Sequence, residues 1–152
     1  MEILITKGKN RNTLTCKRND GTWTSINLGP DIPNHDLAHY VVEKEFDLQH
    51  GFYGKIKSGM TIEQLSDKEI IKTLEAETWL SEIMARNLQA IGSGASNTDQ
   101  FIQLTAWEAR NMDGISIPHM KLSQIEKMKI DFDQLCKQWD EIPQQGTLQL
   151  FF

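Results

Sequence analysis

The chain has 152 residues, a net charge of −5, 39% hydrophobic residues and 24% charged residues. This length and composition predict one globular domain over residues 1–152, and no apolar run approaches the ~20 residues that span a bilayer. The first six residues lack the features of a signal peptide. Two distant cysteines, Cys16 and Cys136, indicate reduced core thiols. We therefore expect a cytoplasmic protein with no membrane partner.

The charge is uneven along the chain. Residues 1–30 carry a net charge of +3, and the remaining residues carry −8. The basic segment could contact a phosphate backbone or an acidic partner. Alternatively, its Lys and Arg residues decorate the exposed side and edge of a small sheet, where they discourage edge pairing. No recognised motif or aromatic platform accompanies the charge, so a nucleic-acid partner is not expected.

The first thirty residues predict an antiparallel β-meander. Residues 2–7 form its first strand, and Arg18-Asn19-Asp20-Gly21-Thr22 is typical of a type I turn closed by a glycine bulge. That loop pairs Leu14 with Ile26 and Cys16 with Thr24, which keeps the apolar residues on one face. A two-residue loop would split this face, so the register favours the bulged turn.

The pattern becomes helical after Asp31. Start and stop signals predict a first helix from Pro33-Asn34 to before Gly51 and a short helical piece over 52–58. A capping box at Ser66-Asp67-Lys68-Glu69 opens a long helix that runs to about Ile91. Two further helices are expected from Thr98 to Met112 and over 119–140. Residues 146–152 then alternate like a strand that could join the sheet. The expected fold class is α+β, with an N-terminal antiparallel β-meander plus a C-terminal strand packed against about four α-helices.

The last helix carries the clearest periodic pattern. Its apolar residues recur at steps of three and four as one stripe: Ile125, Met128, Phe132, Leu135 and Trp139. We expect this stripe to pack into the core. A homodimer seam is the alternative, although two heptads are too few to indicate a coiled coil.

The candidate functional site is the segment His35-Asp36-Leu37-Ala38-His39, followed by Glu43. On a helix, His35 and His39 lie one turn apart on one face, so their imidazoles can converge on one divalent metal ion such as zinc. The spacing resembles the His-Glu-x-x-His helix of zinc proteases, with Asp36 in place of the glutamate base. Glu43 is too far along the axis to share an ion with His35, but it can pair with His39.

Three interpretations of this segment stay open. The histidines could hold a metal whose third ligand comes from elsewhere in the chain, and the candidates for that ligand are His50, His119, Asp113 and Glu108. Asp36 and Glu43 could instead perform acid–base catalysis without a metal. In the third interpretation all these residues are structural, with Asp36 at the positive end of the helix dipole and His39 in a semi-polar core seam.

The segment also resembles a motif of a known family. Pro33, His35, Asp36, Leu37, His39, Val42 and Glu43 follow the form Pro-x-His-Asp-Leu-x-His-x-x-Val-Glu, with Gly51-Phe52-Tyr53-Gly54 downstream and Trp139, Ile142-Pro143 and Gly146-Thr147-Leu148 near the end. This pattern resembles an uncharacterised family of small bacterial proteins with no assigned activity, so the resemblance implies an architecture and no reaction. We expect an interaction or accessory domain with an unidentified protein partner. The alternative is a divalent-metal-dependent or acid–base hydrolase built on His35, Asp36 and His39.

Overall fold

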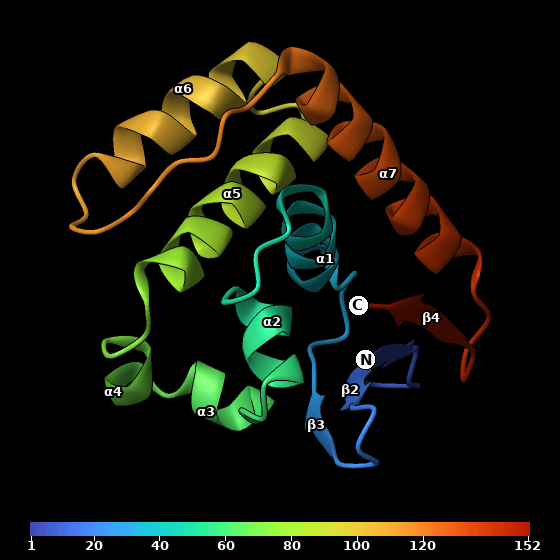
Figure 1. Cartoon of the computed structure of the whole chain (residues 1–152). Helices are drawn as coiled ribbons and strands as arrows, with labels where there is room; N and C mark the ends of the chain where they lie inside the picture. Colours follow the sequence, from blue (N-terminus) through green and yellow to red (C-terminus); the bar gives the residue numbers. More distant parts are fainter.

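The computed structural model describes residues 1–152 and contains one four-stranded antiparallel sheet. Its strands are β1 (Glu2–Thr6), β2 (Thr13–Lys17), β3 (Trp23–Asn27) and β4 (Thr147–Phe151), in the spatial order β3-β2-β1-β4. The C-terminal strand therefore pairs with the N-terminal strand, and the two ends of the chain lie close together (Figure 1). The predicted α+β fold, with a meander completed by a C-terminal strand, is confirmed.

The register of the β2–β3 hairpin also follows the prediction. Leu14 lies opposite Ile26 and Cys16 opposite Thr24. Gly21 has a φ of +86°, in the left-handed region that glycine adopts without strain, and the Arg18 N–H donates to the Thr22 carbonyl oxygen. The bulged turn thus places the apolar residues of both strands on the covered face of the sheet.

The helical part contains four longer and three short helices. They are α1 (Asn34–Phe46), α2 (Phe52–Lys57), α3 (Ile62–Ser66), α4 (Lys68–Ile71), α5 (Ala76–Gly92), α6 (Thr98–Ala109) and α7 (Leu122–Glu141). Helix α1 packs against both α5 and α7, which arch over it; α2 packs under α1 and α5, α3 lies against β3, and α4 follows α3 on the side away from the sheet (Figure 1). Helix α1 is thus the central element of the fold.

The predicted long helix from Ser66 to Ile91 is wrong at its N-terminal half. Asp67, not Ser66, caps a helix, and that helix ends at Ile71; the chain then turns and restarts as α5 at Ala76. The residues of this break have tertiary partners: Leu74 packs against the core, and the Glu75 carboxylate pairs with the Lys55 ammonium group. These contacts outweigh the helical propensity of the segment.

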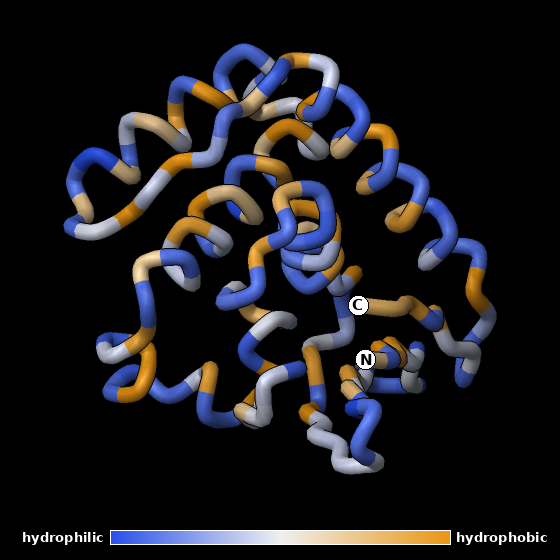
Figure 2. Tube along the Cα trace, in the orientation of Figure 1, coloured by the Kyte–Doolittle hydropathy of each residue, from blue (hydrophilic) through white to orange (hydrophobic).

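The hydrophobic core joins the sheet to α1, α5 and α7. Hydrophobic residues lie on the inward sides of these helices in Figure 2, and hydrophilic residues lie mainly on the outward sides. The predicted stripe of α7 packs into this core: Ile125, Met128, Phe132 and Trp139 are buried, and Leu135 is partly buried against it. Burial of this stripe explains how α7 is held against α1.

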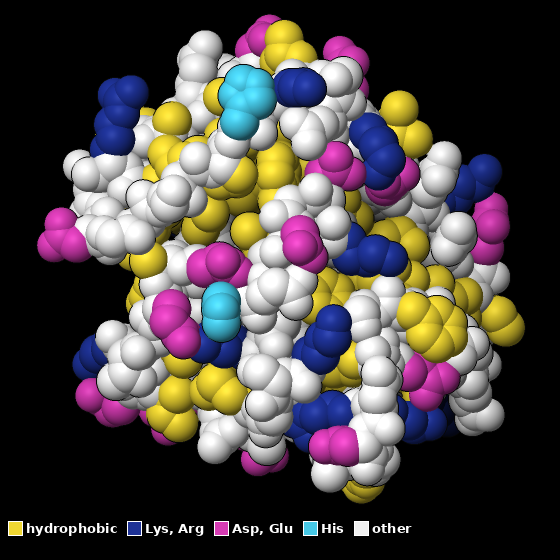
Figure 3. All heavy atoms as spheres, in the orientation of Figure 1, with side chains coloured by type: hydrophobic (Ala, Val, Ile, Leu, Met, Phe, Trp, Pro, Cys, Tyr) yellow, Lys and Arg dark blue, Asp and Glu magenta, His cyan; other side chains and the backbone are white.

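None of the helices is both long and apolar enough to cross a lipid bilayer. On the face drawn in Figure 3, Asp and Glu side chains lie among the Lys and Arg side chains. On this face the positive charge therefore does not form a uniformly basic patch.

Candidate metal centre between α1 and α5

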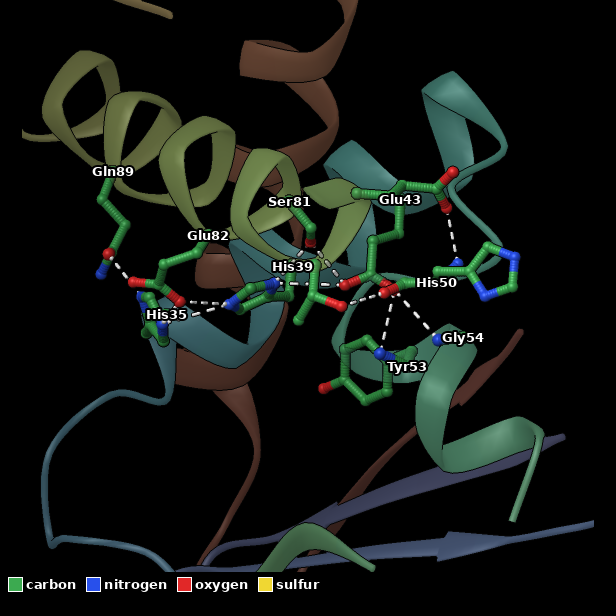
Figure 4. Close-up of polar contacts among 11 residues, drawn as sticks. His35, His39, Glu43, His50, Tyr53, Gly54, Ser81, Glu82 and Gln89 are labelled. Carbon is green, nitrogen blue, oxygen red and sulfur yellow. Dashed lines mark hydrogen bonds and ion pairs between the residues drawn. The ribbon is translucent and has the colours of Figure 1, made fainter. Parts of the chain in front are cut away.

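Three side chains from two packed helices converge on one point. His35 and His39 project from successive turns of α1, and Glu82 projects from α5 (Figure 4). The Nε2 atoms of His35 and His39 are 3.2 Å apart. The Glu82 Oε2 atom is 3.2 Å from His39 Nε2 and 3.3 Å from His35 Nε2. The three atoms form a nearly equilateral triangle.

Hydrogen bonds outside the triangle fix the orientation of the His35 ring. Its Nδ1 atom lies 2.9 Å from Oε1 of Gln89, which accepts the Nδ1–H, and the Gln89 amide group donates to Oδ1 of Asn34 at 3.0 Å. Gln89 is seven residues after Glu82 on α5 and therefore lies on the same helix face. Because Nδ1 is bonded to Gln89, Nε2 is the ring nitrogen of His35 that faces the triangle.

The His39 ring is oriented in the same way by buried groups. Its Nδ1 atom is 3.2 Å from Oε1 of Glu43 and 2.9 Å from Oγ of Ser81. The Ser81 hydroxyl in turn donates to the same Glu43 oxygen at 2.7 Å. The Nδ1–H of His39 thus donates to an anionic site, and its Nε2 atom also faces the triangle. A metal-bound histidine commonly donates the N–H of its other ring nitrogen to a carboxylate in this way, which fixes the ring and makes the ligand nitrogen more basic.

Glu43 links this site to the start of α2. Its second oxygen, Oε2, accepts the backbone N–H groups of Tyr53 at 2.9 Å and Gly54 at 3.1 Å. These are first-turn N–H groups that have no partner within their own helix. A Cβ atom on Gly51 would lie 2.4 Å from Cδ of Glu43, so only glycine leaves room for the carboxylate here. The carboxylate therefore orients His39 and caps α2 at once.

The cluster has a buried side and a solvent-facing side. The side chains of Glu43 and His39 are 0% and 5% exposed, whereas those of Glu82 and His35 are 38% and 43% exposed. Burial acts to lower the pKa of His39, but its bonds to Glu43 and Glu82 raise it to about 9. The bond to Glu82 also raises the pKa of His35, and the bonds to His35 and His39 hold the pKa of Glu82 well below its usual range. In the metal-free protein the two imidazoles thus hold protons between the carboxylates of Glu82 and Glu43, and a divalent ion can displace these protons.

The triangle fits a tetrahedral metal site. Ligand atoms at about 2.0–2.1 Å from a tetrahedral zinc ion lie roughly 3.3 Å from one another. The separations of 3.2–3.3 Å match that spacing. Two neutral imidazoles and one carboxylate form the ligand set of several catalytic zinc sites, in which the fourth position stays open.

A pocket adjoins this centre. It has a volume of about 340 Å³, and two of the three converging residues, His39 and Glu82, form part of its wall. The remaining lining residues are mostly apolar: Phe52, Leu65, Ile71, Leu74, Thr78 and Trp79. The His39 ring packs against Phe52 with their ring centroids 5.3 Å apart. A small molecule in this pocket would touch the metal ligands directly.

The structure brings some of the predicted site residues together and leaves others apart. His35 and His39 share one point, and Glu43 contacts His39. Asp36 takes no part in the hydrogen bonds of this cluster, and its partly buried carboxyl group has a pKa raised by burial. The role of Asp36 as an acid or base stays a prediction.

The third member of the triangle is Glu82, which the sequence interpretation missed. None of the four candidates for the third ligand, His50, His119, Asp113 and Glu108, belongs to the converging group. Glu108, for example, pairs with Arg86, whose Nε atom is also 3.7 Å from Oε1 of Glu82, so Glu108 reaches the cluster only through that arginine. Glu82 comes from a helix 43 residues further along the chain than His39, so no spacing rule connects them. The available signal was Ser81, a small polar residue among the buried positions of α5.

No protein-family model, curated protein or solved structure matches this chain. The resemblance of its motif to a bacterial family therefore stays a prediction.

Proposed function

We propose that this protein binds one divalent metal ion, with zinc favoured, and uses it for hydrolysis. The ligands are Nε2 of His35, Nε2 of His39 and a carboxylate oxygen of Glu82. The observation that supports this most directly is that hydrogen bonds on the far nitrogen of each imidazole turn both Nε2 atoms toward the Glu82 carboxylate, where they can bind a metal ion that displaces their protons. Without a cation or a proton between them, two lone pairs 3.2 Å apart repel.

The side chains have separate roles in this proposal. Glu43 is a positioning residue: it holds His39 through Nδ1 and increases the basicity of the ligand nitrogen. Gln89 does the same for His35. A zinc ion held here would supply Lewis-acid chemistry: it would polarise a substrate carbonyl and lower the pKa of a bound water molecule to about 7. The adjacent pocket supplies the space for the substrate.

Metal binding and hydrolysis are tested together. Purified, untagged protein is stripped with a chelator, titrated with zinc by calorimetry, and assayed against a panel of chromogenic esters and anilides before and after metal is restored. We expect one zinc ion per chain and activity that depends on it. Glu82→Gln should abolish zinc binding and the zinc-dependent activity. The circular dichroism spectrum should stay native, because the Glu82 side chain is partly exposed.

The matched controls for this experiment lie outside the site. His119→Ala and Glu126→Gln change exposed residues of the same types and leave zinc binding and activity intact. A chain that takes up no zinc, or an activity that survives both the chelator and Glu82→Gln, contradicts the proposal. In that case the interaction or accessory domain, which stays a prediction, becomes the better hypothesis.

A further inference from the structure

The pocket beside the metal centre differs in chemistry from the centre itself. Apart from His39 and Glu82, its walls contain five apolar side chains and one hydroxyl group. That hydroxyl, on Thr78, already donates to the His50 carbonyl oxygen at 2.6 Å. No Lys or Arg lines the pocket. A phosphate or a sugar with many hydroxyl groups would find few partners there besides the indole N–H of Trp79 and the converging side chains.

Binding of apolar groups in such a pocket is favourable because it removes apolar surface from water. Each buried CH₂ group strengthens binding by a few-fold in the dissociation constant. The volume of about 340 Å³ is at the lower end of the range for small-molecule sites, which admits one short chain or one ring. His39 and Glu82 form part of the same wall. The atoms attached to a group that fills the pocket would therefore lie next to the metal centre.

We infer that the substrate is an uncharged ester or amide whose acyl group is apolar, and that this acyl group enters the pocket formed by Phe52, Leu65, Ile71, Leu74 and Trp79. This inference rests on the proposed metal-dependent hydrolysis. In the reaction a water oxygen bonds to the carbonyl carbon, and the bond from that carbon to the leaving oxygen or nitrogen breaks. The leaving group takes up a proton, so the products are a carboxylic acid and an alcohol or amine.

Hydroxamates are suitable probes because they chelate zinc through the acyl end and vary only in the attached chain. Acetohydroxamate and hexanohydroxamate are titrated into the zinc-loaded protein by calorimetry. We expect hexanohydroxamate to bind at least about tenfold more tightly, since its additional CH₂ groups are buried in the pocket.

Two substitutions test whether the acyl chain of the hydroxamate binds in the pocket. Leu74→Trp fills the pocket from the loop before α5, and Ile71→Trp fills it from α4; both residues are only partly buried, so the larger ring can be accommodated. Each should reduce the preference for hexanohydroxamate to less than about threefold while zinc affinity is kept. Leu104→Trp, which makes the same change at an exposed position of α6, is the matched control and keeps the full preference.

The possible failures can be told apart. If zinc binds at one ion per chain but the two hydroxamates bind equally, the inference about the acyl group is wrong and the metal centre stands. The same conclusion follows if the preference is present but unchanged in both filled variants. If zinc does not bind, the proposed function and this inference fail together.

Discussion

The two sides of the polar cluster between α1 and α5 differ in how their hydrogen-bonding capacity is used. On the buried side, Glu43 accepts from Ser81, from His39 and from two backbone N–H groups at the start of α2. On the solvent-facing side, Nε2 of His35 and Oε2 of Glu82 point at one shared position, while Oε1 of Glu82 faces Arg86. The buried side thus contributes to stability, and the open side is available for a ligand.

This difference predicts that substitutions on the two sides separate folding from metal binding. The largest effect is expected for Glu43→Ala. It leaves the N–H groups of Tyr53 and Gly54 without an acceptor and His39 without its anionic partner, so we expect the free energy of unfolding to fall by about 3–5 kcal/mol. Urea denaturation of the metal-free protein measures this change. Glu126→Ala on the exposed face of α7 is the control, and a loss below about 1 kcal/mol for Glu43→Ala would show that the buried side is not structural.

The pH dependence of stability in the metal-free protein is the second effect. The pKa of His39 is about 9 in the folded chain and near 6.5 in the unfolded chain, so its protonated form favours folding. This stabilisation is fully present below about pH 6.5 and is lost as the pH rises through 9, by as much as about 3 kcal/mol. The raised pKa of His35 acts in the same direction.

Unfolding in urea at pH 6 to 9.5 with a chelator present measures this dependence. The His39→Gln variant should show a much smaller decline over the same range. Zinc affinity should rise with pH across this window, because the ion displaces the protons. A wild-type stability that increases between pH 7 and 9 without metal would contradict the proposed charge state of the cluster.

A smaller effect is expected at Gly51, which allows the buried side to form. In Gly51→Ala the added Cβ would lie 2.4 Å from Cδ of Glu43, and the carboxylate or the backbone must move. We expect a loss of about 1–3 kcal/mol. Gly29→Ala makes the same change where no atom lies within 4 Å and should alter stability by less than about 0.5 kcal/mol. Equal losses at both positions would mean that the contact with Glu43 is unimportant.

The smallest effect is expected for Tyr53→Phe. The Tyr53 hydroxyl is buried and has no hydrogen-bond partner, so its removal should leave stability unchanged within about 0.5 kcal/mol or increase it. Ser81→Ala, which removes a buried hydroxyl that donates to Glu43, should cost about 1–2 kcal/mol. Thermal unfolding of the two variants compares them directly, and a larger loss for Tyr53→Phe would reveal a missing partner for that hydroxyl.

Local patterns in the sequence were enough to predict the sheet. The bulged turn at Gly21 sets which residues of β2 and β3 pair, and all the residues that decide the register lie within about fifteen positions. The apolar stripe of α7 was predictable for a similar reason, since its spacing reports its buried face directly. The helix break at 72–75 was not predictable, because it depends on Leu74 and Glu75 meeting residues from other elements.

In the candidate site too, contacts within one helix could be predicted and contacts between helices could not. The spacing of His35, His39 and Glu43 follows from the helical period within one element, and their mutual contacts could be anticipated. Glu82, Ser81 and Gln89 reach them only because α5 packs against α1. That packing depends on the whole core, so no short motif in the sequence contains it.

The most direct test of the metal centre is zinc X-ray absorption spectroscopy on the protein loaded with one equivalent of zinc. We predict a four-coordinate ion with two imidazole ligands, with nitrogen and oxygen atoms at about 2.0–2.2 Å. His35→Ala should remove one imidazole from the spectrum, whereas His119→Ala should leave it unchanged. A spectrum without imidazole ligands, or one that is identical in wild type and His35→Ala, would contradict a metal centre at His35, His39 and Glu82.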